Sequence, residues 1–435
     1  MRSVQVGICG LGTVGAGVFN LLTRNSQPIK ARANCAINVL QVGARRDNPN
    51  CDTADTEIVR DIFDVAKNPQ VDIVVELIGG TTVAYDLVMT ALDHGKHVVT
   101  ANKALIAEHG MEIFAVAASK GLVVAYEAAV AGGIPIIKAL REGLAANRIN
   151  WLAGIINGTT NFILSEMDSK GRDFEDVLVE AQQKGYAEAD PTFDVEGIDA
   201  AHKLVILASL AFGMPLSLEG LFTDGITNLE PQDVAYAREL GYVVKHLGIA
   251  RSSDQGVELR VHPTLVPEKS LIAAVNDVSN AVMIDADAVG TTLFYGPGAG
   301  SEPTASAVIA DIVDVARTID AKADARVPAL GCDLSLLQPR PIMDIEDIET
   351  SFYMRFSALD KPGVLSDITK IMADSSISIE AIIQREHPVG EDYVNVIILT
   401  NVTKEKLLDG AVEHIEQLET VRGSIHFIRV EHLDQ

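Results

Sequence analysis

The chain has 435 residues, of which 48% are hydrophobic and 22% charged, a composition typical of a globular protein with two or three domains. Acidic residues outnumber lysine and arginine by 60 to 35, which gives a formal net charge of −25. A chain this negative repels phosphate backbones and anionic lipids, so neither nucleic acid nor a membrane is expected as a partner.

The cysteines and the N-terminus indicate a reducing compartment. Four scattered cysteines form no CxxC pair, which predicts neither a zinc site nor a disulfide framework. The sequence runs from Met1 directly into a strand-like segment, so no signal peptide is expected. The longest apolar run, residues 204–216, is too short to span a bilayer. A cytoplasmic location is the expectation.

The first part of the chain alternates between short apolar runs and helical patterns. Strands are expected at residues 4–9, 37–43, 73–77, 98–100 and 122–126, and helices at 14–24, 58–67, 85–94 and 104–120. This alternation predicts an α/β domain with a parallel, doubly wound sheet of the Rossmann type over residues 1–130.

The pattern changes after the glycines at 132 and 133. A strand at 151–156, a helix at 200–212 and further strands within 259–284 predict an α+β domain for catalysis and dimerisation over residues 131–330. A helix expected at 305–320, within the segment 305–328, returns to the nucleotide domain. Two prolines and several acidic residues indicate a linker at 331–349.

The last part, residues 350–435, follows a β-α-β-β-α-β order. Strands are expected at 351–357, 377–386, 393–400 and 423–430, and helices at 364–373 and 404–418. This order predicts a ferredoxin-like domain.

A glycine-rich turn follows the first strand directly and opens the first helix. Its spacing, GxGxxG, permits a tight turn, close approach of a pyrophosphate and close helix packing. The same letters also occur in a plain tight turn, but the position within a βαβ series favours a nucleotide site. The residues expected to bind the cofactor here are Gly10, Leu11, Gly12, Thr13, Val14 and Gly15.

The end of the second expected strand bears on the choice of cofactor. An acid there would hold the ribose 2′-OH of NAD, but the sequence has Arg45 and Arg46 instead. Guanidinium groups suit a 2′-phosphate, so NADP is favoured, with NAD also possible. The alternative is a solvated basic pair.

Two lysines are candidates for proton chemistry. Lys103 follows the carboxyl end of a parallel strand, where ligands bind in open α/β sheets. Asp199 and Lys203 lie four residues apart at the start of an apolar helix, so they share one face at the mouth of a buried element. The alternatives are a surface lysine and an exposed acidic loop with one ion pair.

Two loops complete the candidate site. The segment 157–161 joins a strand to a helix and offers free N–H groups to a carboxylate. The segment 296–303 is rich in glycine, which permits backbone to close over the cofactor, or it is a simple turn.

These blocks together resemble homoserine dehydrogenase with a C-terminal ACT domain, over essentially the whole chain. The resemblance depends on the turn at 10–15 and the blocks at 100–103, 157–161, 185–191, 199–203 and 296–300. It implies NAD(P)-dependent interconversion of L-homoserine and L-aspartate 4-semialdehyde, in the biosynthesis of threonine, methionine and isoleucine.

The resemblance also implies roles for single residues. Lys203 and Lys103 are the expected proton-handling residues, and Lys103 also contacts the cofactor. The implied substrate residues are Glu188, Asp194, Asp199, Thr159, Tyr186 and Gly158, and further cofactor residues are Gly298 and Glu302. A monovalent cation, sodium or potassium, is expected on the backbone of Glu127, Val130, Gly132 and Ile134.

The ACT domain implies regulation. The loop 359–365 resembles an effector loop, with L-threonine as the expected effector and a module used only for assembly as the alternative. A homodimer or homotetramer is expected.

Two alternative functions fit the sequence less well. A semialdehyde dehydrogenase that forms a thioester would need a cysteine nucleophile, and no cysteine lies in a suitable position of the second domain. A binding regulator without turnover leaves the lysine and carboxylate constellation unexplained.

Overall fold

The computed structural model describes residues 3–54, 56–385 and 392–433. The chain folds into two compact units, each assembled from three stretches. The first unit comprises Met1–Gly158, Asp199–Glu219 and Val278–Arg340, and the second comprises Thr159–Ile198, Gly220–Asp277 and Pro341–Gln435. No helix among the described residues is both long and apolar enough to cross a membrane.

A six-stranded parallel sheet forms the centre of the first unit. The strand order is β3-β2-β1-β4-β5-β6, the order of a Rossmann domain, which confirms the predicted fold class. The central strands are buried on both faces, which explains their near-continuous apolar sequences. The strands are β1 (Ser3–Cys9), β2 (Ala36–Gly43), β3 (Glu57–Val59), β4 (Ile73–Glu76), β5 (His97–Thr100) and β6 (Val124–Ala125).

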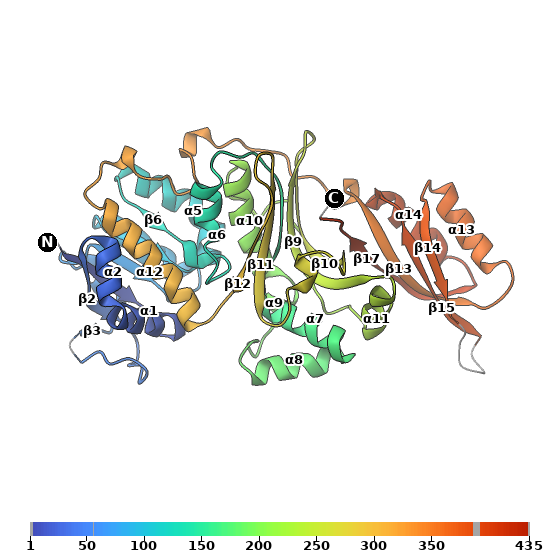
Figure 1. The fold of residues 1–435 in the computed structure, drawn as a ribbon, viewed down its shortest axis with the longest axis horizontal. Helices are drawn as coiled ribbons and strands as arrows, with labels where there is room; N and C mark the ends of the chain where they lie inside the picture. The colour runs from blue at the N-terminus through green and yellow to red at the C-terminus, as the bar shows by residue number, and fades with distance from the viewer. Residues whose placement is uncertain (1–2, 55, 386–391, 434–435) are drawn as a thin grey trace. The chain divides into compact units, whose positions relative to one another are not determined.

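Six helices pack around this sheet. The last of them follows the others by some hundreds of residues in sequence, yet α12 lies beside α1, and Ser301 Oγ donates a hydrogen bond to Thr13 O at 2.7 Å (Figure 1). The helices are α1 (Thr13–Arg24), α2 (Ser26–Ala33), α3 (Ile62–Lys67), α4 (Thr82–Asp93), α5 (Lys103–Ser119) and α12 (Ser301–Thr318).

The segment 58–67, predicted as one helix, is two elements. Its first residues belong to β3, which pairs in parallel with the end of β2. Asp61 then caps α3, with its carboxylate accepting a hydrogen bond from Phe63 N at 2.9 Å. A three-residue strand is too short to show a two-residue period, so the helical spacing of the following residues dominated the pattern.

An antiparallel sheet and a buried helix complete the first unit. Strand β11 (Ser279–Ala286) pairs with β7 (Ile149–Ile155) on one side and β12 (Gly290–Pro297) on the other. Helix α10 (Ile198–Phe212) is buried along most of its length, as its apolar sequence predicts. The short helix α6 (Ile136–Lys138) follows the glycine pair at 132 and 133.

The second unit contains a long antiparallel hairpin and several helices. Strands β9 (Tyr242–Ser252) and β10 (Val257–Pro267) pair along their whole lengths, and β8 (Phe222–Thr223) pairs with β10. The helices of this part are α7 (Gly158–Lys170), α8 (Phe174–Gln183), α9 (Thr192–Val195) and α11 (Pro231–Glu239).

The C-terminal module has the predicted ferredoxin-like topology, with an additional short strand. Its antiparallel sheet has the order β17-β13-β15-β14, and both helices bury their apolar faces in one core with β13. The predicted strand at 377–386 is shorter than expected, and its last residue lies outside the described residues. The elements are β13 (Glu349–Leu359), α13 (Val364–Asp374), β14 (Ile379–Gln384), β15 (Tyr393–Thr400), β16 (Thr403–Lys404), α14 (Glu405–Glu416) and β17 (Val421–Val430).

The module is joined to the hairpin of the second unit by its last strand. The end of β17 pairs in parallel with β10 through Arg429 and Val430. Just beyond it, Glu431 forms a 2.6 Å ion pair with Arg260, and both side chains are almost completely buried. Each partner has one further ion pair, Arg260 with Glu258 at 3.0 Å and Glu431 with Arg251 at 3.2 Å, so the contact is part of a buried charge network that is costly to disrupt.

Candidate active site

The glycine turn after β1 is shaped to receive a phosphate group. Gly10 has a φ of +106°, and a Cβ there would lie 2.6 Å from Leu77 O. A Cβ on Gly15 would collide with Gly10 O, whereas Gly12 faces open space. No side chain caps the N-terminus of α1, so its first N–H groups remain available. These features fit the pyrophosphate of a dinucleotide.

Three arginines lie at the end of β2 or beside it. Arg45 and Arg46 are exposed. Arg60, which is not among the residues predicted from the sequence, donates hydrogen bonds to Ala44 O at 3.1 Å and to Asp47 at 2.8 Å. Asp47, the acid that follows Arg45 and Arg46 in the sequence, is therefore already paired with a guanidinium. The pairing of β3 with β2, which carries Arg60 to this position, has no clear signal in the sequence.

A single buried carboxylate holds both candidate lysines. Asp199 is 2% exposed, and its two oxygens lie 2.5 Å from Lys103 Nζ and 2.6 Å from Lys203 Nζ. Lys203 Nζ also donates to Ile156 O at 2.6 Å, and Asn157 Nδ2 donates to Asp199 Oδ2 at 2.9 Å. The i,i+4 pair predicted from sequence is present, and Lys103 is a second cation that the sequence did not assign to it.

The two ammonium groups keep the Asp199 carboxyl group ionised. Burial alone would raise the pKa of Asp199, but Lys203 and Lys103 outweigh burial and hold the pKa of the carboxyl well below its usual range. The side chain of Lys103 is 32% exposed and that of Lys203 is 12% exposed. The cluster therefore carries a fixed negative charge and two cationic proton donors, one of them partly open to a ligand.

The substrate residues expected from the resemblance divide between the two units. Gly158 belongs to the first unit, at the start of α7. In the second unit, Thr159 Oγ1 donates to Tyr186 O at 2.6 Å, and the Tyr186 side chain is among the exposed aromatics. Glu188 is exposed and forms no ion pair with any described residue, whereas Asp194 is half-buried in α9.

The glycines at 296–300 serve a packing role. A Cβ on Gly298 would collide with the Asn280 side chain, and a Cβ on Gly132 would collide with Gly298 O. The loop thus packs against the glycine pair that follows β6. Glu302, at the start of α12, forms a 2.7 Å ion pair with Arg24, and both side chains are mostly exposed.

In the segment expected to hold a cation, the one acidic side chain is already hydrogen-bonded. The Glu127 carboxylate accepts hydrogen bonds from Ile137 N and Lys138 N, each at 2.9 Å. Ala131 and Gly132 both have positive φ values, 54° and 44°. The described residues contain no group of three or more His, Cys, Asp or Glu side chains able to hold a metal. Carbonyl oxygens are suitable ligands for a hard cation.

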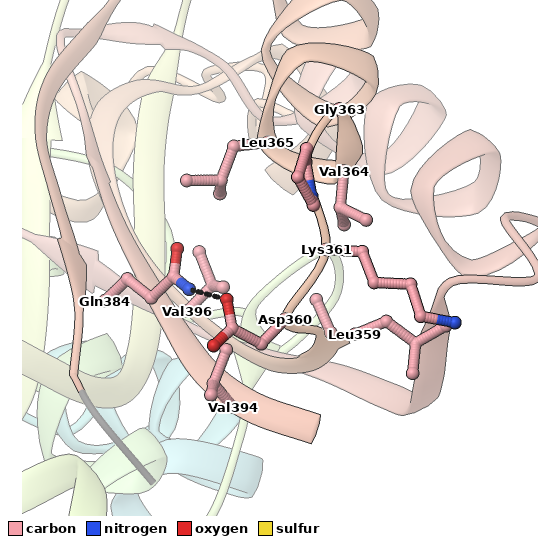
Figure 2. A pocket seen from close by; sticks show the side chains of 11 residues that line it. Leu359, Asp360, Lys361, Gly363, Val364, Leu365, Gln384, Val394 and Val396 are labelled. Carbon is pink, nitrogen blue, oxygen red and sulfur yellow. Dashed lines mark hydrogen bonds between the residues drawn. The ribbon is translucent and has the colours of Figure 1, made fainter. Parts of the chain in front are cut away.

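The loop 359–365 of the C-terminal module lines a small cavity of about 160 Å³ (Figure 2). Asp360 accepts a hydrogen bond from Gln384 Nε2 at 3.1 Å, and Gly363, at a φ of +99°, is the N-cap residue of α13. Val394 and Val396 form part of the wall. A larger cavity of about 760 Å³ in the first unit is lined by none of the predicted site residues.

Comparison with known proteins assigns three segments to family models. Residues 10–127 match the model described as "Homoserine dehydrogenase, NAD binding domain", residues 135–313 match "Homoserine dehydrogenase" and residues 352–420 match "ACT domain".

Curated relatives match over their whole length. The homoserine dehydrogenase of Pseudomonas aeruginosa is 59% identical and that of Neisseria gonorrhoeae 49% identical, and in both cases the match covers 100% of each chain. Among solved structures, a homoserine dehydrogenase from Thiobacillus denitrificans superimposes with a TM-score of 0.94 at 55% identity, over 100% of this chain and 99% of that chain. A hyperthermophilic archaeal homoserine dehydrogenase in complex with NADPH matches 73% of this chain and 98% of its own, with a TM-score of 0.63 at 26% identity.

Proposed function

This chain belongs to the homoserine dehydrogenase family, and from that premise we propose that Lys103, Asp199 and Lys203 form its catalytic centre. The protein is an NAD(P)-dependent oxidoreductase with a C-terminal ACT domain. The observation that carries the proposal is the single buried carboxylate that holds two ammonium groups. Such a cluster keeps proton donors in place at the carboxyl edge of the parallel sheet, where ligands bind in this fold.

Proton transfer is assigned to Lys203. A nicotinamide cofactor held by the glycine turn at 10–15 would supply the hydride chemistry at the terminal carbon of the substrate. In the direction of reduction, the Lys203 ammonium gives a proton to the alkoxide as it develops, and in the direction of oxidation its amine takes the hydroxyl proton. Asp199 fixes the lysine and compensates its charge. Lys103, the more open of the two, orients the substrate oxygen.

Recognition of the amino acid is assigned to the residues implied by the family. Glu188 binds the substrate ammonium, because its carboxylate is exposed and has no cationic partner among the described residues. Asp194 supports this site, and Gly158, Thr159 and Tyr186 line it. The substrate is L-homoserine in one direction and L-aspartate 4-semialdehyde in the other.

NADP is proposed as the preferred cofactor. Arg45 and Arg46 are exposed at the end of β2, where a 2′-phosphate would lie, and Arg60 neutralises the neighbouring Asp47. The NADPH complex of the archaeal relative supports this choice. Gly298 and Glu302 remain candidates for contacts with the cofactor.

A monovalent cation, sodium or potassium, is proposed on the loop after β6. Its ligands would be the backbone oxygens of Glu127, Val130, Gly132 and Ile134. The Glu127 side chain is already used by two backbone N–H groups, which leaves only its carbonyl oxygen for this role.

Regulation is assigned to the C-terminal module. L-Threonine is proposed to bind in the cavity of the loop 359–365, where Asp360 suits an ammonium group and the N-terminus of α13 suits a carboxylate. The enzyme is proposed to act as a homodimer or homotetramer. The cytoplasmic location stays a prediction.

One absorbance assay tests the central assignment. The purified chain is mixed with L-homoserine and either NADP or NAD, with and without L-threonine, and formation of the reduced nicotinamide is followed. We expect turnover with both cofactors, faster at limiting NADP than at limiting NAD, and a lower rate with threonine. No turnover with either cofactor would refute the catalytic centre, and unaltered rates with threonine would refute the effector.

A further inference from the structure

A fully buried carboxylate stands at the carboxyl end of β4, outside the lysine cluster. Glu76 is 0% exposed, and its Oε1 accepts hydrogen bonds from Ile78 N at 2.9 Å and Gly79 N at 3.1 Å. Its Oε2 accepts a hydrogen bond from Thr100 Oγ1 at 2.5 Å. No lysine or arginine of the described chain forms an ion pair with it. A buried charge is costly without such donors, so this arrangement is a specific one.

The hydrogen bonds continue from Thr100 to the start of α5 and return to the loop after β4. Asn102 N donates to Thr100 Oγ1 at 3.0 Å, and Asn102 Oδ1 caps α5 by accepting from Leu105 N at 3.1 Å. Asn102 Nδ2 donates to Gly80 O at 2.6 Å. The loop 77–80 and the first turn of α5 are thus closed into one hydrogen-bonded ring, with Glu76 as its only charged member.

This ring lies next to the proposed proton donors. Glu76 and Thr100 are register partners at the ends of adjacent parallel strands. Lys103 is the first residue of α5, directly after the cap, and its ammonium lies 2.5 Å from Asp199. An ammonium at a helix N-terminus is electrostatically unfavourable, so its position must be imposed by structure around it.

We propose, on the basis of the catalytic role assigned to Lys103 above, that Glu76 is a positioning residue for the reaction. Through Thr100 and Asn102 it fixes the first turn of α5 and so holds the Lys103 ammonium on Asp199. It fixes the loop 77–80, at the edge where the nicotinamide would lie, by the hydrogen bonds that it accepts from Ile78 N and Gly79 N. Glu76 touches no reacting atom and acts only through these neighbours.

The test is a double-mutant cycle with two readouts. Glu76→Gln keeps the size of the side chain and removes the charge, and Thr100→Val removes the hydroxyl while keeping the shape. Each is expected to lower kcat about 10-fold, with little change in the affinity for NADP measured by fluorescence titration. In the double variant, kcat is expected to fall by about the same factor as in either single variant, not by the product of the two factors, because both substitutions break the same hydrogen bond between Thr100 and Glu76.

Hydrogen exchange gives the second readout, which does not depend on turnover. In both variants we expect faster amide exchange in peptides that cover 77–80 and 101–105, with exchange in β1 and β2 unchanged. Thr100→Ser, which keeps the hydroxyl, is expected to retain wild-type rates and exchange. Glu57→Gln is the matched control, since Glu57 is an exposed acid of the same sheet that also accepts a hydrogen bond, from Gln41 Nε2.

Several outcomes would overturn the assignment of Glu76. One is a wild-type kcat with wild-type amide exchange in Glu76→Gln. Another is a loss of kcat in the double variant equal to the product of the two single losses, together with faster exchange throughout the sheet. That result would mean that Glu76 contributes to general stability only. If Glu76→Gln does not fold, the comparison of Thr100→Val with Thr100→Ser tests the proposal. Equal kcat and equal exchange in these two variants would overturn it. If Lys103→Ala retains full activity, the role of Lys103 fails separately, and the exchange data still show whether the ring exists.

Discussion

Lys203 reaches back one turn of α10 and places its ammonium 2.6 Å from the Asp199 carboxylate. We predict that Lys203→Ala lowers turnover by about 10²-fold or more, because the proton donor is lost, while NADP binding stays close to that of the wild type. Steady-state rates and a fluorescence titration of the cofactor measure the two effects. Near-wild-type turnover would remove Lys203 from the mechanism.

Helix α7 supplies a matched control for this substitution. Lys170 pairs with Glu166 at 2.6 Å in the same i,i+4 spacing, but the Lys170 side chain is largely exposed. Because Lys170 itself is exposed and Glu166 keeps a second cationic partner, Arg172 at 3.1 Å, Lys170→Ala is expected to leave kcat unchanged and to alter the free energy of unfolding by less than about 1 kcal/mol.

The charge of Asp199 is expected to make stability depend on acid pH. Its pKa is lowered in the folded state by Lys203 and Lys103, so its stabilising effect is complete above the unfolded value of 3.8 and is lost as the pH falls towards the folded pKa. We predict that Asp199→Asn lowers the free energy of unfolding by about 3 kcal/mol at neutral pH, because two ammonium groups lose their partner.

The difference in Tm between the wild type and Asp199→Asn should therefore narrow below about pH 4. Thermal unfolding followed by circular dichroism over a pH series measures it. Asp86→Asn, at an exposed position of α4, controls for the loss of one negative charge. A difference in Tm that stays constant down to low pH would contradict the assigned direction of the pKa.

Lys245 gives a second pH dependence, at the alkaline end. Burial lowers the pKa of this lysine from 10.5 to about 8, against the opposing charges of Asp168 and Asp277. Its ammonium donates to Val275 O at 2.6 Å and to Asn276 Oδ1 at 2.9 Å. Between these two pH values the unfolded chain binds the proton and the folded chain does not, so this group makes stability rise with pH.

We predict that Lys245→Met removes this contribution. Relative to the variant, the wild type should gain stability as the pH rises from about 8 to about 10.5, by at most a few kcal/mol. Urea unfolding at several pH values measures the difference. Lys269→Met, at an exposed position of the same unit, should show no such trend. A difference that falls with rising pH would reverse the assigned sign.

The effector role proposed for the loop 359–365 can be tested in the full-length chain. We predict that Asp360→Ala abolishes inhibition by L-threonine, because the carboxylate proposed to bind the threonine ammonium is lost. The uninhibited kcat should change by less than about 2-fold, because Asp360 does not belong to the lysine cluster. Rates are measured against threonine concentration. Asp374→Ala, at the end of α13, is the control. Unchanged inhibition in Asp360→Ala would place the effector elsewhere.

The sequence predicts most of the fold because burial on both faces leaves near-continuous apolar strands between helices of regular period. It fails where an element is short or weakly buried. The strand β3 has three residues, and α2, which was not predicted, buries only Ile29 and Ala33. Neither leaves a periodic signal strong enough to detect.

The site is predictable only where its contacts are local. Asp199 and Lys203 share a helix, so their spacing predicts their pairing. The contact of Lys103 with the same carboxylate joins two helices and has no local signature. Glu76 is an acid within the apolar strand predicted at 73–77, but its position at the strand end and its partners are visible only in the structure.

The pairing of β17 with β10 has a practical consequence for limited proteolysis. A protease that cut the chain between 344 and 348 would sever the covalent path into the C-terminal module. The strand pairs at Arg429 and Val430 and the enclosed charges of Arg260 and Glu431 would still bind the two fragments together. We therefore expect the nicked enzyme to elute as one species under native conditions and to separate only in denaturant.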